Sequence, residues 1–204
     1  MRQIASGYSS AMTDELFRSM FEDRKEVFVD LLKWDVPVLE GRYEVDQFDS
    51  ENATYIVIPS PDGRHLGSAR LLATDGAHIL GSIFPGLCEA PPPSGRDILE
   101  ITRFCLSRRL CARDRRLVRD QLVSALVDYA LEHRISQYTG VAERPWFQQI
   151  LSFGWECRPL GLPAAQAGAD LIALAIDIDA RTPAKMAAAG VYRSVALRDL
   201  AAAA

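Results

Sequence analysis

The sequence predicts a mixed β-sheet with helices packed against it. Two segments with apolar residues at helical spacing lie at about 13–33 and 117–133. Strand-like runs of apolar and β-branched residues lie around them, at 53–59, 66–73, 98–107, 135–141 and 170–177. Strands and helices mixed in this way along 204 residues are typical of one α/β or α+β domain, here spanning 1–204.

The first elements follow from periodicity and turn residues. Thr13, with Glu15 soon after, marks a plausible helix start, and apolar residues then recur as far as about Lys33. Segment 34–50 is rich in Pro, Gly and Asp, so we expect an irregular surface loop. The strands at 53–59 and 66–73 flank "SPDGRH", whose Pro-Asp-Gly core predicts a hairpin turn.

The second half of the chain continues the sheet. "AHILGSIFPGL" (77–87) predicts a short strand and then a break, and "EAPPPSGRD" (89–97) a flexible connector. A strand at 98–107 precedes the second helix, and the segments after it predict a strand, a helix and two more strands, at 135–141, 146–152, 155–158 and 170–177. The alanine-rich tail, 184–204, is compatible with a helix.

Composition excludes several classes of protein. A net charge of −4 argues against a general nucleic-acid binder. The four cysteines form no CxxC pair and no histidines cluster, so we expect free thiols, no metal and no disulfide framework. No stretch approaches the roughly 20 apolar residues that cross a bilayer, and the N-terminus has no signal-peptide pattern. We therefore expect a cytoplasmic protein with no membrane partner.

Charged residues that interrupt apolar patterns are the candidates for chemistry. Arg70 stands inside an apolar strand, where a charge needs a partner or a ligand. Glu100 and Arg103 are three apart, so a regular strand would point them to opposite faces unless a bulge re-aims one. Two readings stand at parity on residue types alone: a structural salt-bridge network, or a pocket for a small ligand that carries charges and an aromatic ring.

The order of these residues resembles the acyl-homoserine-lactone synthases of the autoinducer-synthase (LuxI-type) family. The resemblance covers most of the chain. It rests on Arg24, Phe28, Trp34, "EVDQFD", Arg70 in "GSARLL", "IFPGL", "LEITRF" and "FGWECRPLGLP…ADLIALAIDI". It implies an N-acetyltransferase-like fold whose mixed sheet is split into a V, with residues 1–50 as a mobile part of the substrate pocket.

The family resemblance implies a reaction and its participants. These synthases transfer an acyl group from a thioester to the amine of S-adenosylmethionine (SAM) and then close the lactone with loss of methylthioadenosine. Both molecules are substrates, so no cofactor is implied. The donor is an acyl carrier protein or acyl-CoA. A general N-acetyltransferase and a non-catalytic sensor of small ligands are the alternatives.

The resemblance also assigns roles to residues. Glu100 is the candidate acceptor of the amine's proton, and Arg103 is a substrate-pocket arginine. The implied SAM-binding set is Arg24, Phe28, Trp34, Asp46, Asp49, Arg70, Phe84 and Phe104.

Two further regions concern the acyl donor. Six arginines within 107–119, against one acid, indicate an acidic partner or simply a solvated helix face: Arg108, Arg109, Arg113, Arg115, Arg116 and Arg119. The glycine signature that acetyltransferases use for coenzyme A is absent here. The acyl chain is expected between strand 135–141 and helix 146–152, beside Thr139, Trp146, Phe147 and Phe153, with Thr139 a candidate for a 3-position oxygen. Core packing explains the three aromatics equally well, and the type of acyl group stays open.

Overall fold

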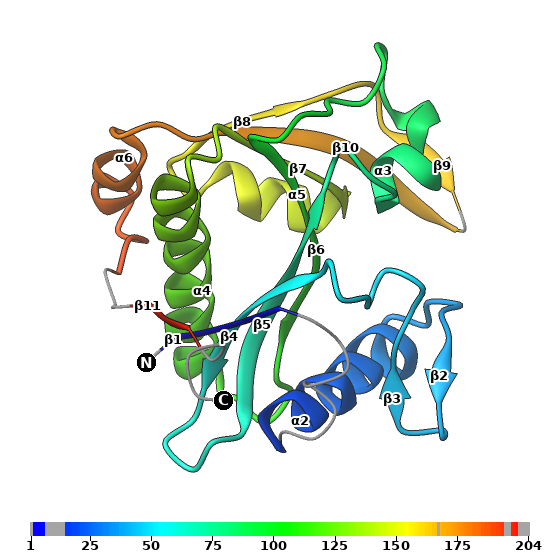
Figure 1. The fold of residues 1–204 in the computed structure, drawn as a ribbon, viewed down its shortest axis with the longest axis vertical. Coiled ribbons are helices and arrows are strands. Elements are labelled where there is room, and N and C mark those ends of the chain that lie inside the picture. Colours follow the sequence, from blue (N-terminus) through cyan, green and yellow to red (C-terminus); the bar gives the residue numbers. More distant parts are fainter. Residues whose placement is uncertain (1, 7–14, 167, 194–196, 200–204) are drawn as a thin grey trace. The chain divides into compact units, whose positions relative to one another are not determined.

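The computed structural model describes residues 2–6, 15–166, 168–193 and 197–199 (Figure 1). The chain forms two compact units. Unit 1 comprises residues 1–71, 103–125 and 194–204, and unit 2 comprises 72–102 and 126–193. Strand β5 (His65–Ala73), strand β6 (Ile98–Leu106) and helix α4 (Ala112–His133) each contribute residues to both units.

Unit 1 is built on a sheet in the order β11-β1-β4-β5-β6. Strands β4 (Thr54–Pro59) and β5 form the predicted hairpin around a turn in which Gly63 has a φ of +82°, a conformation that glycine adopts without strain. β1 (Arg2–Ser6) pairs antiparallel with β4 and parallel with β11 (Leu197–Asp199). Neither of these outer strands was predicted, and residues 197–199 are a strand where the sequence allowed a helical tail.

The N-terminal helix of unit 1 changes its character part-way. Helix α2 (Glu15–Arg24) continues directly into a π-helix, Lys25–Leu31, and Thr13 lies outside the described residues. Phe17 and Phe21 on α2 pack edge-to-face on Tyr55 of β4. The segment predicted as an irregular loop contains a small hairpin of β2 (Val38–Leu39) and β3 (Tyr43–Glu44), so that prediction was wrong at these four residues.

Unit 2 contains the rest of the sheet. The first half of β6 pairs parallel with β7 (Gln137–Glu143), and β10 (Ala169–Asp177) pairs antiparallel with β7, β8 (Glu156–Pro159) and β9 (Ala164–Gln166). Helices α5 (Arg144–Leu151) and α6 (Thr182–Ala188) also belong to this unit. The described strands therefore form a mixed sheet with helices, which confirms the predicted fold class. The V-shaped opening stays a prediction.

One predicted strand was wrong. Residues 77–87 form a short helix α3 (Ile79–Ser82) and a 3₁₀ turn (Pro85–Leu87). The apolar residues there favoured a strand, but Glu100 accepts the backbone N–H groups of Ile79 and Leu80 at 2.7 and 2.8 Å. These are N–H groups that the first turn of a helix leaves without a partner, so a distant carboxylate stabilises the helical conformation.

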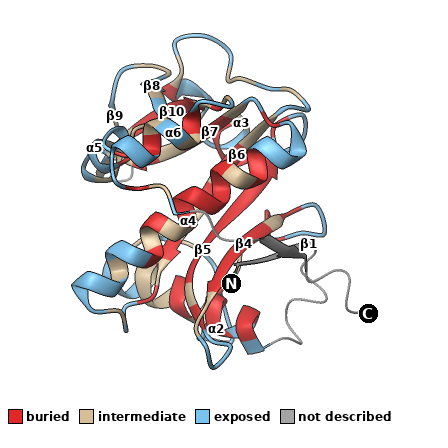
Figure 2. Ribbon diagram, turned by 90° about the vertical axis from the view of Figure 1, so that its left-hand side faces the viewer, coloured by how far each residue is buried: buried red, intermediate tan, exposed pale blue. Residues whose placement is uncertain are grey.

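Burial differs between the strands of the hairpin and the long helix α4. Figure 2 shows β4 and β5 almost wholly buried, and α4 exposed in its first turns and buried further along. No helix in the described part of the chain is long and apolar enough to cross a bilayer.

Candidate active site

Six charged side chains meet inside unit 1. They come from four separate parts of the chain: Arg24 ends α2, Glu44 lies on β3, Asp46 and Asp49 follow it, Arg70 lies on β5 and Arg103 on β6. In space their charges alternate, because each arginine contacts two carboxylates and each carboxylate two arginines. Their charges sum to zero. Five of the six side chains are at most 5% exposed, and Arg103 is 9% exposed.

Arg24 joins two carboxylates of the cluster. Its Nε donates to Glu44 at 2.6 Å, and its two terminal nitrogens bind Asp49 at 2.8 and 2.9 Å. Tyr55 donates its hydroxyl to Asp49 at 2.8 Å. Because two parallel N–H···O bonds fix the planes of both groups, Arg24 determines how the loop carrying Asp49 lies against α2.

Arg70 and Arg103 share the remaining acids. Arg70 binds Asp46 through both terminal nitrogens, at 2.6 and 3.0 Å, and lies 2.7 Å from Asp49. Arg103 donates twice to Glu44, at 3.0 and 2.9 Å, and once to Asp46, at 2.7 Å. The charge of Arg70 inside an apolar strand is thus explained by two carboxylates.

The electrostatics favour the charged forms. Burial by itself would raise the pKa of Asp49, but Arg24 and Arg70 outweigh it and hold that pKa well below its usual range. Burial likewise opposes ionisation of Asp46, and Arg70 and Arg103 lower the pKa of this carboxyl. The pKa of Tyr55 is raised by its burial and by the negative charge of Asp49, so the phenol keeps its proton as a donor.

Arg103 reaches the cluster through an unusual backbone conformation. Its φ is +50°, in the left-handed region that residues other than glycine rarely adopt. The sequence allowed for a local irregularity between Glu100 and Arg103, and this one interrupts the regular strand at the arginine. Such strain costs about 1–3 kcal/mol and concentrates at functional sites.

A pair of aromatic rings faces the same guanidinium. Phe28 and Trp34 stack with their ring centres 4.7 Å apart. The carbon at the centre of the Arg103 guanidinium lies 5.6 Å from the Phe28 ring and 5.8 Å from the Trp34 ring. The wider π-helical turn, with the Trp34 N–H bonded to the Phe28 carbonyl at 2.8 Å, brings the two rings together.

Sequence reasoning missed Glu44. This carboxylate is completely buried and joins Arg24 to Arg103. The signal was present in "EVDQFD", where Glu44 and Asp46 are two apart and therefore lie on one side of an extended chain.

Glu100 lies in unit 2 and stabilises the start of helix α3. It is fully buried, and its two oxygens bind the first two amides of α3. Phe84, also in unit 2, packs against the buried cluster of Leu80, Leu87 and Ala173. Phe104, beside Arg103 on β6, belongs to unit 1 and is half-buried.

The residues predicted for the acyl chain are distributed within unit 2. Phe153 is buried and packs edge-to-face on Trp146 and Trp155. Thr139 is fully buried on β7. Of the four predicted residues, Phe147 lines a groove of about 320 Å³ that runs beside α5, together with Arg144, Gln148, Leu151, Pro159, Gly161, Leu162, Pro163 and Ile172.

The six arginines have different surroundings. Arg109 binds the buried Asp23 at 2.8 and 3.1 Å, Arg115 donates to the Ser107 carbonyl at 3.1 Å, and Arg119 pairs with its neighbour Asp120 at 2.6 Å. The other three, Arg108, Arg113 and Arg116, are exposed.

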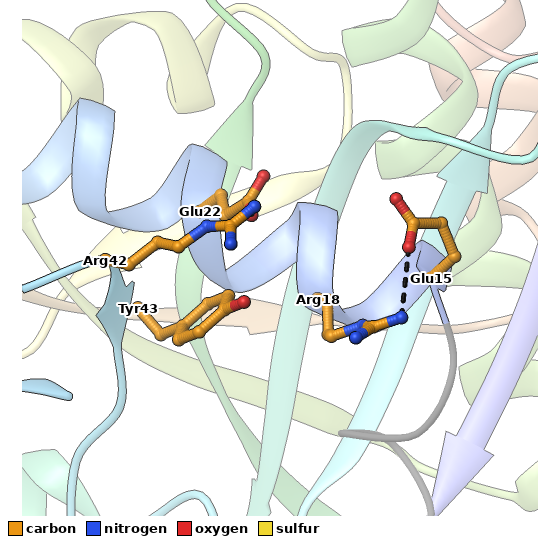
Figure 3. Close-up of a pocket in the computed structure, with 5 residues that line it drawn as sticks. All are labelled: Glu15, Arg18, Glu22, Arg42 and Tyr43. Carbon is orange, nitrogen blue, oxygen red and sulfur yellow. Dashed lines mark hydrogen bonds and ion pairs between the residues drawn. The ribbon is translucent and has the colours of Figure 1, made fainter. Parts of the chain in front are cut away.

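Figure 3 shows a pocket lined by Glu15, Arg18 and Glu22 of α2 and by Arg42 and Tyr43, none of them a predicted site residue. Its volume is about 70 Å³. Its charges are already paired, Arg18 with Glu15 and Arg42 with Glu22, so it offers little to a charged ligand. In the described part of the chain, His, Cys, Asp and Glu form no group of three or more that could hold a metal ion.

Comparisons with known proteins decide the family. Residues 8–186 match the model of the autoinducer synthase family. The chain belongs to this family. An acyl-homoserine-lactone synthase of Ralstonia nicotianae is 31% identical over 82% of this chain and 84% of its own length. One from Rhizobium etli is 34% identical over 74% of this chain and 73% of its own.

Solved structures agree with this assignment. A CoA-dependent acyl-homoserine lactone synthase with SAM and isopentyl-CoA aligns with a TM-score of 0.84 and 27% identity, over 98% of this chain and 92% of that one. An N-acetyltransferase from Lactobacillus plantarum shares the fold alone, with a TM-score of 0.55 and 16% identity over 87% and 99% of the two chains. Family membership, an acyltransferase of the acyl-homoserine-lactone synthase type and the likeness to N-acetyltransferases are thereby confirmed. The roles of individual residues in this autoinducer synthase stay predictions.

Proposed function

We propose that this autoinducer synthase uses the charged cluster of unit 1 to bind SAM and acylates its amine from a thioester, after which the lactone closes and methylthioadenosine leaves. The observation that carries the proposal is the arrangement around Arg103. One guanidinium bonds two carboxylates and faces two stacked aromatic rings. SAM carries a carboxylate, two cationic groups and an adenine, and this set of side chains complements all of them.

The cluster divides into a scaffold and a contact surface. Arg24 is buried and donates to both Glu44 and Asp49, which are buried as well, so it holds the 44–49 segment in place. Arg103 and Asp46 are the most exposed members, at 9% and 5% of their side chains. We assign to Arg103 the carboxylate of SAM, to Asp46 the charge around the amine, and to Phe28 and Trp34 the adenine.

Glu100 is our candidate for accepting the amine's proton, directly or through water. An ammonium has no lone pair with which to attack a thioester, so the proton must leave first. Glu100 also holds the start of α3, which fixes its carboxylate in one orientation. A base that is positioned by the backbone keeps its geometry through the reaction.

The acyl donor brings negative charge whichever carrier it has. Coenzyme A and the phosphopantetheine arm of a carrier protein both contain phosphate, and exposed arginines raise the rate of encounter with anions. Arg108, Arg113 and Arg116 are exposed arginines of this arginine-rich stretch. The related structure with isopentyl-CoA supports a coenzyme A donor, and the missing glycine signature speaks for a carrier protein.

The deciding experiment measures methylthioadenosine by mass spectrometry after purified protein is incubated with SAM and a panel of acyl-CoA and acyl-carrier-protein donors. Release of methylthioadenosine together with an acyl-homoserine lactone supports the proposal and identifies the donor. Acetyl transfer to an amine without methylthioadenosine would instead support a general N-acetyltransferase. Ligand binding without any product would support a sensor. A matched Arg103→Gln variant should lose SAM binding, whereas Arg181→Gln, on an exposed pair in unit 2, should not.

A further inference from the structure

A second group of polar side chains lies at the end of helix α2 in unit 1. Its centre is Asp23, the residue before Arg24, with a side chain that is 0% exposed. Arg109, from the turn between β6 and α4, binds the two oxygens of Asp23 at 2.8 and 3.1 Å. Nδ1 of His65, at the start of β5, lies 2.7 Å from the same carboxylate. We call Asp23, His65 and Arg109 the Asp23 anchor.

The partners of Asp23 keep it as a buried anion. Burial by itself opposes ionisation, but His65 and Arg109 outweigh it and lower the pKa of this carboxyl. Because a carboxylate only accepts, Nδ1 of His65 carries the proton in their bond. Burial lowers the pKa of His65, so its ring is neutral at neutral pH, and Nε2 then accepts the hydroxyl of Ser68 at 2.9 Å.

The Asp23 anchor fixes α2 against β5. The backbone N–H of His65 donates to the hydroxyl of Ser19, one helical turn before Asp23, at 3.0 Å. Arg109 also donates to the carbonyl of His65, at 3.1 Å. Since residues four apart lie on one face of a helix, α2 is bonded to β5 at two points along the same face. Bidentate bonds fix an angle as well as a distance, so they restrict both sliding and rotation of the helix end.

The next residue along α2 belongs to the candidate site. Adjacent side chains on an α-helix point about 100° apart, so Asp23 and Arg24 face different partners. Arg24 binds carboxylates of the 44–49 segment, and the π-helix that carries Phe28 begins directly after it. A shift or rotation at the end of α2 would therefore move Arg24 and Phe28 together, although neither is part of the Asp23 anchor.

We propose that Asp23 is a positioning residue for the binding of SAM, which it supports by fixing the end of α2 with Arg109 and His65 as partners. The proposal rests on the proposed function and adds residues outside the set assigned to SAM. It also gives Arg109 a task different from docking of the acyl donor. A buried carboxylate that only held the fold together would affect the melting temperature but not the affinity of the folded protein for SAM.

Isothermal titration calorimetry of the full chain with SAM alone tests the proposal, at a temperature well below the melting temperature of each variant. Asp23→Asn keeps the size of the side chain but presents an NH₂ group to donors, so the bidentate bond to Arg109 is lost. The Kd for SAM should rise roughly three- to a hundredfold. The KM for the acyl donor, measured at saturating SAM, should stay unchanged.

Glu22→Gln is the matched control. It makes the same change from carboxylate to amide one residue earlier on α2, in a pair with Arg42 whose side chain is 65% exposed. Exposed pairs contribute little, so the Kd for SAM should stay at the wild-type value.

Arg109→Gln keeps the proposal testable if Asp23→Asn does not fold. The side chain of Arg109 is 42% exposed, and its loss leaves His65 bonded to Asp23. The Kd for SAM should rise here too, by a smaller factor. Adding Arg109→Gln to Asp23→Asn should raise it little further, because both changes remove the same bond.

The outcomes separate this proposal from the proposed function. Failure of the wild-type protein to bind SAM would refute the proposed function itself. With SAM bound by the wild type, an unchanged Kd in Asp23→Asn and Arg109→Gln, or an equal rise in Glu22→Gln, would overturn the positioning role while the synthase assignment stands. A higher donor KM with an unchanged Kd for SAM in Arg109→Gln would also overturn it, and would return this arginine to the docking surface.

Discussion

Replacing Arg24 by methionine tests whether the buried cluster is a scaffold. Methionine fills a similar volume but removes three charge-assisted bonds, at 2.6, 2.8 and 2.9 Å. Glu44 then keeps only Arg103 of its two arginines, Asp49 keeps only Arg70, and the cluster carries one uncompensated negative charge. Breaking a buried ion pair in this way costs about 3–5 kcal/mol.

The same helix provides a matched control. Arg18 pairs with Glu15 one turn away at 3.2 Å, with side chains 45% and 71% exposed. Exposed pairs of this kind contribute about 0–1 kcal/mol. For a protein of this size, 1 kcal/mol shifts Tm by about 2–4 °C. Arg24→Met should therefore lower Tm by about 6–20 °C, and Arg18→Met by no more than about 4 °C.

Thermal unfolding followed by circular dichroism measures both shifts. The double variant Arg24→Met with Asp49→Asn restores the balance of charge in the cluster. It should unfold at a higher temperature than the sum of the two single changes predicts, because contacting residues couple by about 0.5–3 kcal/mol. Equal Tm shifts for Arg24→Met and Arg18→Met, or strict additivity in the double variant, would refute the view that Arg24 organises the cluster.

Three more predictions follow from other contacts. In Glu100→Gln an amide N–H replaces one acceptor oxygen, so we expect faster hydrogen exchange in α3 and amide formation slower by roughly 10²–10⁴-fold; turnover near the wild-type rate would remove Glu100 as proton acceptor. Reversing the exposed Arg113 and Arg116 to Glu should raise KM for the acyl donor and weaken its salt dependence, and an unchanged donor KM would leave a merely solvated helix face. Burial lowers the pKa of His65 despite its bond to Asp23, so the unfolded chain takes up the proton first. The free energy of unfolding should therefore fall as pH drops below about 6.5, and a His65→Asn variant should show a flatter profile in urea titrations.

Much of the fold was predictable because its signals are local. The β4–β5 hairpin and helix α4 follow from alternation, helical period and turn residues that lie next to one another in the chain. β1 and β11 carry no comparable signal, and they are strands because they pair with each other and, through β1, with β4. Helix α3 was read as a strand because the group that stabilises it, Glu100, comes about twenty residues later.

The candidate site shows the same limit at the level of side chains. The sequence identified Arg70 as a charge in need of a partner. No pattern in the sequence shows that Asp46 binds it through both terminal nitrogens and that Asp49 adds a further contact. Glu44 escaped notice because a carboxylate in a segment predicted as an irregular surface loop is expected to be solvated, and only the structure shows it buried on β3.

A buried cluster of six charged side chains is a poor way to gain stability, because well-packed apolar side chains of similar volume often stabilise as well or better. Its value here lies in what it positions. Glu44 and Asp46 hold Arg103 against the stacked rings of Phe28 and Trp34, in a backbone conformation that costs free energy by itself. The buried members also keep the 44–49 segment from presenting its carboxylates in other orientations. The cluster therefore fixes a single orientation of Arg103, the arginine that we propose binds the carboxylate of SAM.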